Sequence, residues 1–179
     1  MLNEGISYLD QVEAFIRPRL NGVPLILDWG GDTGKNTPFK NECKQLHIYD
    51  ISGKNAIEGA RRVSKQEALC QKYDLIVCSH VLEHVPFPSD VLLEIRDCMK
   101  TGSLLYIELP FEAIMQDEVA KQILAKRHWH EHINFFSESS LVSLLNACGY
   151  IVVEIKTEKL ETPIGLMSVF LILASYEFH

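Results

Sequence analysis

The chain has 179 residues, of which 47% are hydrophobic and 23% charged, a composition that suits a compact globule and excludes intrinsic disorder. Its net charge of -7 has the wrong sign for a protein that gains affinity by neutralising phosphates, so we expect no nucleic-acid partner. The length fits one domain, and we take residues 1–179 as a single unit.

Three features of the sequence concern its compartment. The longest apolar run, residues 164–174, is shorter than the roughly 20 residues of a membrane helix. The N-terminal stretch carries acids where an export signal has basic residues, and the five cysteines are an odd number without a C-x-x-C pair. We therefore expect a cytoplasmic protein with reduced cysteines and no membrane partner.

The first half of the chain alternates between helix and strand patterns. Apolar residues recur on one face between positions 5 and 19, which predicts an N-terminal helix within residues 1–20. Short apolar runs bounded by glycines or acids predict buried strands, and a glycine-rich turn leads from the first strand into the first helix of the sheet. The strands are expected at residues 24–29, 46–50 and 60–64.

The second half continues the alternation and ends in two consecutive strands. One helix is expected from Ser89, as N-cap, to Met99, and another from Ser137 until Gly149. Residues 111–136 are polar, aromatic and rich in histidine, and are too long for a bare loop, so we interpret them as a lid over a substrate. Strands are expected at residues 73–78, 103–109, 150–156 and 165–174.

This element order predicts the architecture. Five strand-helix units followed by two strands across a loop of about nine residues favour an α/β fold. We expect a doubly wound, mostly parallel seven-stranded sheet with an antiparallel C-terminal hairpin and helices on both faces. Ligands of such sheets bind at the carboxyl ends of the strands.

The turn after the first predicted strand, Asp28 to Gly34, is the most informative stretch. It fails the dinucleotide pattern G-x-G-x-x-G and the P-loop pattern, and Asp28 and Asp32 would repel a pyrophosphate. Asp50 ends the second strand, where an acid accepts hydrogen bonds from ribose hydroxyls. An acidic glycine turn followed by a ribose acid favours a nucleoside with a positive charge, a description that fits S-adenosylmethionine.

These residues resemble the class I S-adenosylmethionine-dependent methyltransferases. The sequence from Asp28 to Gly34 matches the first motif of that family except at Asp32, where the family has a glycine. Asp50 matches the second-strand acid of the family, and the stretch 73–85 resembles its fourth-strand motif. The stretches 130–137 and 141–150 resemble the subgroup that acts on sugars and other small metabolites. The resemblance implies a Rossmann-like fold and methyl transfer to a small molecule by in-line displacement.

The resemblance also implies roles for single residues. The first motif would hold the amino-acid end of the cofactor, Asp50 its ribose and Ile51 its adenine, while the residues after the fourth strand would lie below the sulfonium. The expected cofactor residues are Asp28, Gly30, Gly31, Asp32, Gly34, Asp50, Ile51, Ser79 and His80. A base, where the acceptor needs one, would come from His84, His130 or His132.

Several alternatives stay open at this stage. His80, Glu83 and His84 would share a face on a helical turn, and with His130 or His132 they could bind a divalent metal, although we expect none. Asp32 could crowd the cofactor, which leaves a non-catalytic or partner-dependent methyltransferase-like domain as the competing function. A nicotinamide-dependent oxidoreductase is disfavoured by the failed dinucleotide pattern. A homodimer would complete a pocket that this short chain leaves open.

Overall fold

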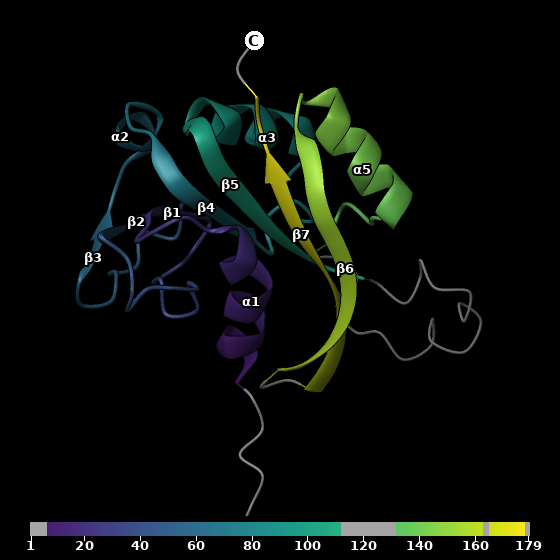
Figure 1. The fold of residues 1–179 in the computed structure, drawn as a ribbon, viewed down its shortest axis with the longest axis horizontal. Coiled ribbons are helices and arrows are strands. Elements are labelled where there is room, and N and C mark those ends of the chain that lie inside the picture. Colours follow the sequence, from purple (N-terminus) through teal and green to yellow (C-terminus); the bar gives the residue numbers. More distant parts are fainter. Residues whose placement is uncertain (1–6, 112–131, 163–164, 178–179) are drawn as a thin grey trace, which may run out of the picture.

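The computed structural model describes residues 7–111, 132–162 and 165–177. Its centre is one seven-stranded sheet with the strand order β3-β2-β1-β4-β5-β7-β6 (Figure 1). The first five strands run parallel, and β7 pairs antiparallel with both β5 and β6. The strands are β1 (Leu25–Trp29), β2 (Gln45–Tyr49), β3 (Ala60–Arg62), β4 (Tyr73–Ser79), β5 (Met99–Pro110), β6 (Ile151–Thr162) and β7 (Gly165–Ser175). The predicted fold class is confirmed.

Helices cover both faces of the sheet, because alternate side chains of each strand point to opposite faces and both sets are apolar. Neighbouring residues of a strand point to opposite faces, so Ile26 packs with α1 whereas Leu27 packs in the cluster that holds the other helices. The helices are α1 (Tyr8–Ile16), α2 (Lys65–Leu69), α3 (Pro88–Asp97) and α5 (Glu138–Ala147), with a 3-10 turn at Arg17–Arg19. Figure 1 shows α1 lying across the sheet.

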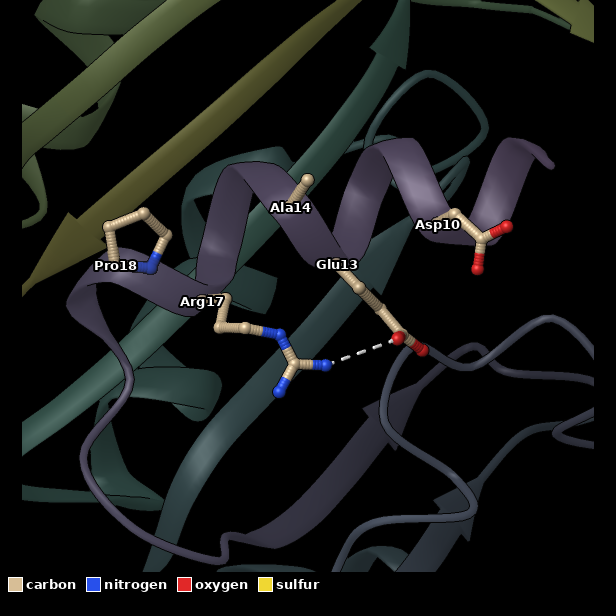
Figure 2. Close-up of a pocket in the computed structure, with 5 residues that line it drawn as sticks. All are labelled: Asp10, Glu13, Ala14, Arg17 and Pro18. Carbon is tan, nitrogen blue, oxygen red and sulfur yellow. Dashed lines mark ion pairs between the residues drawn. The ribbon is translucent and has the colours of Figure 1, made fainter. Parts of the chain in front are cut away.

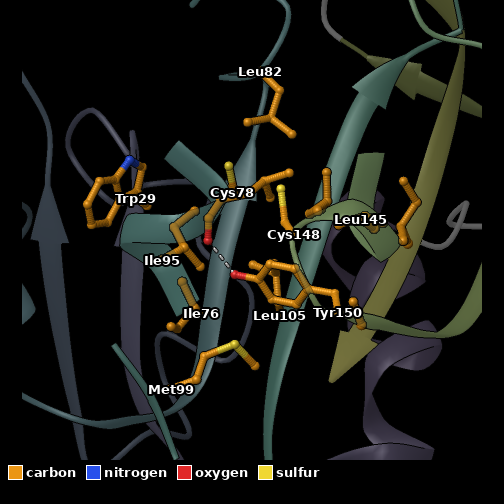
Figure 3. Close-up of a cluster of buried hydrophobic side chains, with 14 of the residues drawn as sticks. Trp29, Ile76, Cys78, Leu82, Ile95, Met99, Leu105, Leu145, Cys148 and Tyr150 are labelled. Carbon is orange, nitrogen blue, oxygen red and sulfur yellow. Dashed lines mark hydrogen bonds between the residues drawn. The ribbon is translucent and has the colours of Figure 1, made fainter. Parts of the chain in front are cut away.

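The larger apolar cluster includes buried residues of α2, α3 and α5. Figure 3 shows some of its side chains. In this cluster the hydroxyl of Tyr150 donates a hydrogen bond to the backbone carbonyl of Leu92 (Figure 3). The buried hydroxyl therefore has a hydrogen-bond partner. Cys78, Cys98 and Cys148 are buried, and all five cysteines are free, as predicted. Burial raises the pKa of the Cys78 thiol, which makes it an inert core residue.

The ends of the helices follow recognisable signals. Ser137 caps α5 with a capping box, and Gly149 follows α5 with φ of 84°, both as predicted. Ser7 caps α1 in the same way. The prediction that Ser89 caps the next helix is wrong, because α3 begins at Pro88 with Phe87 as its N-cap. Proline fits the first helical position, where its missing N–H is not needed.

Two connections also differ from the prediction. The glycine turn after β1 does not lead into a helix: residues 30–44 form turns only, since Pro38 lacks an N–H and disfavours helical backbone at Thr37. The prediction of a loop of about nine residues before the last strand is wrong as well. β6 extends to Thr162, so that residues 163–164 alone separate it from β7.

Candidate active site

The candidate site lies where the parallel strands end together. Register pairs Trp29 with Tyr49 at the ends of β1 and β2, and Ser79 with Glu108 near the ends of β4 and β5. The segments that follow these strands therefore meet at one edge of the sheet. This edge is where open α/β sheets bind their ligands.

The glycine turn approaches its neighbours so closely that side chains do not fit. A Cβ on Gly31 would lie 2.2 Å from Cγ of Asp28, and one on Gly30 would lie 2.4 Å from Cγ2 of Val81. Gly30 and Gly34 also have φ of 83° and 81°, a region that favours glycine. The backbone N–H of Gly30 donates to the carbonyl of Tyr49 at 2.7 Å, which ties the turn to β2.

Asp28 lies beneath this turn and is buried. Its carboxylate accepts a hydrogen bond from the hydroxyl of Thr37, which belongs to the turn-rich connection between β1 and β2. Burial raises the pKa of Asp28 to about 7, the hydrogen bond from Thr37 opposes this rise, and the charge of Asp50 adds to it. A cation above the turn would therefore favour the ionised form of Asp28.

Asp50 is held by backbone donors. The N–H of Asp32 donates to Oδ2 at 3.0 Å and the N–H of Ser52 donates to Oδ1 at 2.6 Å. Burial opposes ionisation of Asp50, but the hydrogen bonds from Ser52 and Asp32 outweigh it, and the pKa of Asp50 is lowered. Arg62 donates to the carbonyl oxygens of both Asp50 and Asp32, so the predicted glycine turn and the predicted ribose acid form one unit.

The side chain of Asp32, the departure from the family motif, turns toward the loop after β2. It forms an ion pair with Lys54 at 3.0 Å and accepts a hydrogen bond from the hydroxyl of Ser52. Its φ of 49° lies in the left-handed region, which aspartate tolerates better than most residues. Ile51 is 93% exposed beside Asp50, an apolar side chain with room for a ligand face.

At the end of β4 the structure places Ser79 and His80 beside β5. Nδ1 of His80 lies 3.2 Å from Oε1 of Glu83, and Nε2 lies 2.9 Å from Oε1 of Glu108. Burial lowers the pKa of His80, but the hydrogen bonds with Glu108 and Glu83 outweigh it and raise the pKa to about 10. Both ring nitrogens thus have a carboxylate partner, so we expect His80 to contact a cofactor through its backbone and not through its side chain.

Glu108 is a site residue that the sequence patterns did not single out. It is 1% exposed, and its carboxylate accepts hydrogen bonds from the hydroxyls of Tyr8 and Tyr106, both at 2.5 Å, in addition to His80. Burial raises the pKa of Glu108, but the hydrogen bonds from these three donors outweigh it, so the pKa of Glu108 is lowered. An acid inside the apolar run of β5 was the only signal available in the sequence.

The predicted histidines are brought together in part. The ring centroids of His84 and His132 lie 4.7 Å apart at an interplanar angle of 73°. The backbone N–H groups of Ile133 and Asn134 donate to the carbonyl of Glu83, which fixes this segment to the turn after β4. His130 belongs, with most of the predicted lid at 111–136, to the stretch 112–131 outside the described residues.

Figure 2 shows a pocket elsewhere, on the outer side of α1. Glu13 and Arg17 form an ion pair across it at 3.6 Å, and both side chains also bind outside the helix, to Phe39 and Glu42. The lining residues are Asp10, Glu13, Ala14, Arg17 and Pro18. No residue predicted for the site lies among them, so the pocket carries no chemistry related to it.

Among the helices that the structure describes, none has the length and apolar character needed to cross a membrane.

The sequence has relatives among known proteins. Residues 5–155 match the family model described as a methyltransferase domain. The ubiquinone biosynthesis O-methyltransferase of Burkholderia orbicola (strain MC0-3) is 30% identical over 91 residues, which are 47% of this chain and 39% of that relative. The chain therefore matches about two fifths of the length of this curated relative.

Solved structures share the fold at low sequence identity. A S-adenosylmethionine-dependent methyltransferase of Methanosarcina mazei has a TM-score of 0.70 at 21% identity, over 92% of this chain and 98% of that one. The 1,6-didemethyltoxoflavin-N1-methyltransferase of Burkholderia thailandensis, solved with 1,6-didemethyltoxoflavin and S-adenosylhomocysteine, has a TM-score of 0.69 at 16% identity. The match covers 97% of this chain and 80% of that one.

Proposed function

The chain belongs to the family of S-adenosylmethionine-dependent methyltransferases, and from this premise we propose that it transfers the methyl group of S-adenosylmethionine to a small molecule. The observation that carries the proposal is the hydrogen bond from the backbone of Asp32 to Asp50. It joins the glycine turn and the ribose acid at the carboxyl edge of the sheet.

The residues at this edge fit the cofactor. Its ammonium and sulfonium are cationic, and the edge offers the buried acid Asp28 and the ionised acid Asp50. Gly30, Gly31 and Gly34 keep the backbone bare where the amino-acid end would bind, and Ile51 offers an exposed apolar face for the adenine. The ion pair of Asp32 with Lys54 supports a position of its side chain that leaves the cofactor room.

Residues around the reacting end would act by position. The cofactor supplies an activated methyl group, so the protein has to align the acceptor rather than form a covalent intermediate. Ser79 and the backbone of His80 would line the floor of the site at the end of β4. His84 and His132 lie together beside it, and we assign to them, with His130, the removal of a proton from the acceptor.

A hydroxyl oxygen of a metabolite is the acceptor we favour. The name of the Burkholderia orbicola relative, an O-methyltransferase, supports an oxygen acceptor, and the resemblance to enzymes of small metabolites includes sugars. The five free cysteines support a reducing compartment, the cytoplasm. We also propose a homodimer, in which the second subunit completes a pocket that one chain leaves open.

Calorimetric titration with S-adenosylhomocysteine tests the cofactor. We expect one site with a micromolar dissociation constant, and no heat with a nicotinamide dinucleotide at the same concentration. Tight binding followed by methyl transfer to hydroxylated metabolites supports the enzyme. Absence of binding at millimolar ligand would replace it with the competing function, a domain that depends on a partner chain or does not catalyse.

A further inference from the structure

Glu108 is a buried acid inside an apolar strand. The residues on either side of it in β5 are apolar and fully buried. Burying a carboxylate is unfavourable unless hydrogen-bond donors replace the lost water. Three described groups donate to it: the hydroxyls of Tyr8 and Tyr106, each at 2.5 Å, and Nε2 of His80 at 2.9 Å. Because apolar residues often fill such a place at no loss of stability, packing alone does not explain the acid.

His80, the partner of Glu108 in the turn after β4, has an uncommon backbone conformation. Its φ of 53° lies in the left-handed region, which a residue with a side chain keeps only when its surroundings hold it there. Glu108 holds it twice, because the backbone N–H of His80 donates to the carbonyl of Glu108 at 2.9 Å and Nε2 donates to the carboxylate. Nδ1 donates to Glu83 at 3.2 Å. The conformation of this turn therefore depends on an acid of the neighbouring strand.

The turn that begins at His80 packs against the glycine turn after β1. Val81 follows His80, and its Cγ2 lies 2.4 Å from the place that a Cβ on Gly30 would take. The two turns are therefore in direct contact, with no room for a further atom between them. Since packed groups move together, a shift of the turn at His80 displaces the glycine turn or opens a gap beside it. The link from Glu108 through His80 to Val81 thus connects β5 with the glycine turn.

We propose that Glu108 is a positioning residue of the cofactor site. It fixes the backbone of His80, and with it the distance between the turn after β4 and the glycine turn. Its carboxylate is 1% exposed and accepts hydrogen bonds from protein donors at both oxygens, so its effect on a ligand passes through His80. The inference rests on the proposed binding of S-adenosylmethionine and adds a residue to that site.

The charge of Glu108 strengthens its hold on His80. Burial lowers the pKa of His80, but the hydrogen bonds with Glu108 and Glu83 raise it to about 10, so the ring is protonated and both nitrogens donate. Hydrogen bonds between charged groups are roughly twice as strong as neutral ones. Glu108→Gln keeps the shape of the side chain and one acceptor oxygen but removes the charge. This substitution therefore tests the link with little change in packing.

Calorimetric titration with S-adenosylhomocysteine in a double-mutant cycle tests the proposal. We expect Glu108→Gln to weaken binding about tenfold. His80→Asn removes the imidazole but keeps a residue type that tolerates the left-handed region, and it should weaken binding by a similar factor. In the His80→Asn background, Glu108→Gln should weaken binding by less than about twofold, because the link between the two residues is already broken.

Tyr150→Phe is the matched control for a general loss of stability. It removes a buried hydroxyl that donates to the carbonyl of Leu92, in the larger apolar cluster on the other face of the sheet. We expect it to lower the melting temperature and to leave the affinity for S-adenosylhomocysteine unchanged. The imidazole of His80 gives a second readout by NMR. Its pKa should fall from about 10 toward the ordinary value of 6.5 in Glu108→Gln, a change that lost packing alone would not cause.

The outcomes separate this inference from the proposed function. Absence of binding by the unsubstituted protein contradicts the proposed function, and the inference fails with it. Binding that Glu108→Gln leaves unchanged, or losses that add in full in the double variant, overturn the role of Glu108 alone. If thermal unfolding shows that Glu108→Gln does not fold, Glu108→Asp takes its place in the cycle. It keeps the charge, but its shorter side chain draws back from His80, and the same results decide.

Discussion

The hydroxyl of Tyr8 donates a hydrogen bond to the carboxylate of Glu108, one hundred positions later in the chain. Tyr8 is the first residue of α1, and Glu108 lies near the end of β5. The same carboxylate is bonded to His80 after β4. The start of the N-terminal helix is thus attached directly to the edge of the sheet that carries the site.

Replacing Tyr8 by Phe removes this attachment. Because a hydrogen bond to a charged group contributes about 1.5–3 kcal/mol, we expect the free energy of unfolding in urea to fall by roughly that amount. The comparison is a double-mutant cycle with Glu108→Gln, in which the loss should shrink because the charged acceptor is gone. An equal loss in both backgrounds would show that Tyr8 contributes by packing alone.

Gly31→Ala should disrupt the turn above Asp28. The added Cβ would lie 2.2 Å from Cγ of Asp28, so either the turn or the buried acid has to move. We expect at least a tenfold loss of affinity for S-adenosylhomocysteine in calorimetry, with a lower melting temperature. Gly53→Ala is the control, since its Cβ meets no atom within 4 Å of the described structure and adds only about 1 kcal/mol of strain.

Stability should depend on pH through Asp28. Burial raises the pKa of Asp28 from its ordinary value of 3.8 to about 7, so the folded state holds a proton that the unfolded state releases. The stability that this proton contributes is therefore lost as the pH rises from about 4 to 7, and above pH 7 the contribution of Asp28 no longer changes with pH. The difference in unfolding free energy between the protein and Asp28→Asn should fall across that interval, and a constant difference would contradict the assignment.

Asp50→Ala should weaken cofactor binding. Removing a charged acceptor of ribose hydroxyls costs on the order of 10- to 100-fold in affinity for S-adenosylhomocysteine. The loss also releases the N–H groups of Asp32 and Ser52, which loosens the glycine turn. Asp90→Ala, at an exposed position in the first turn of α3, is the matched control, and equal affinity of the two variants would remove Asp50 from the site.

Most of the sheet could be predicted because its strands are short apolar runs bounded by turn residues. Leu25–Trp29 and Tyr73–Ser79 are buried on both faces, and a continuous apolar run is the pattern of such strands. The limits of β6 could not be predicted, since its far half is polar and is held as a strand by pairing with β7. Tertiary pairing overrides local preference there.

The site could be predicted in part, for a similar reason. Asp28 and Asp50 follow apolar runs whose ends must meet in a parallel sheet, so their approach followed from the strand order. The pairing of His80 with Glu108 depends on the register of β4 against β5, which local patterns do not contain. The hydroxyl of Tyr8 gave no signal, because an aromatic residue on a helix is expected to pack in the core.

β7 follows β6 in the chain but lies between β5 and β6 in the sheet. During synthesis the ribosome therefore releases six strands before the one that joins them into a single sheet. Until then the edge of β5 stays unpaired, an exposed template for association with other chains. The 11 residue pairs of the β6–β7 hairpin are close in sequence, which favours formation of the hairpin before it docks on β5 as a unit. A nascent chain that stalls before β7 should therefore be a client of chaperones.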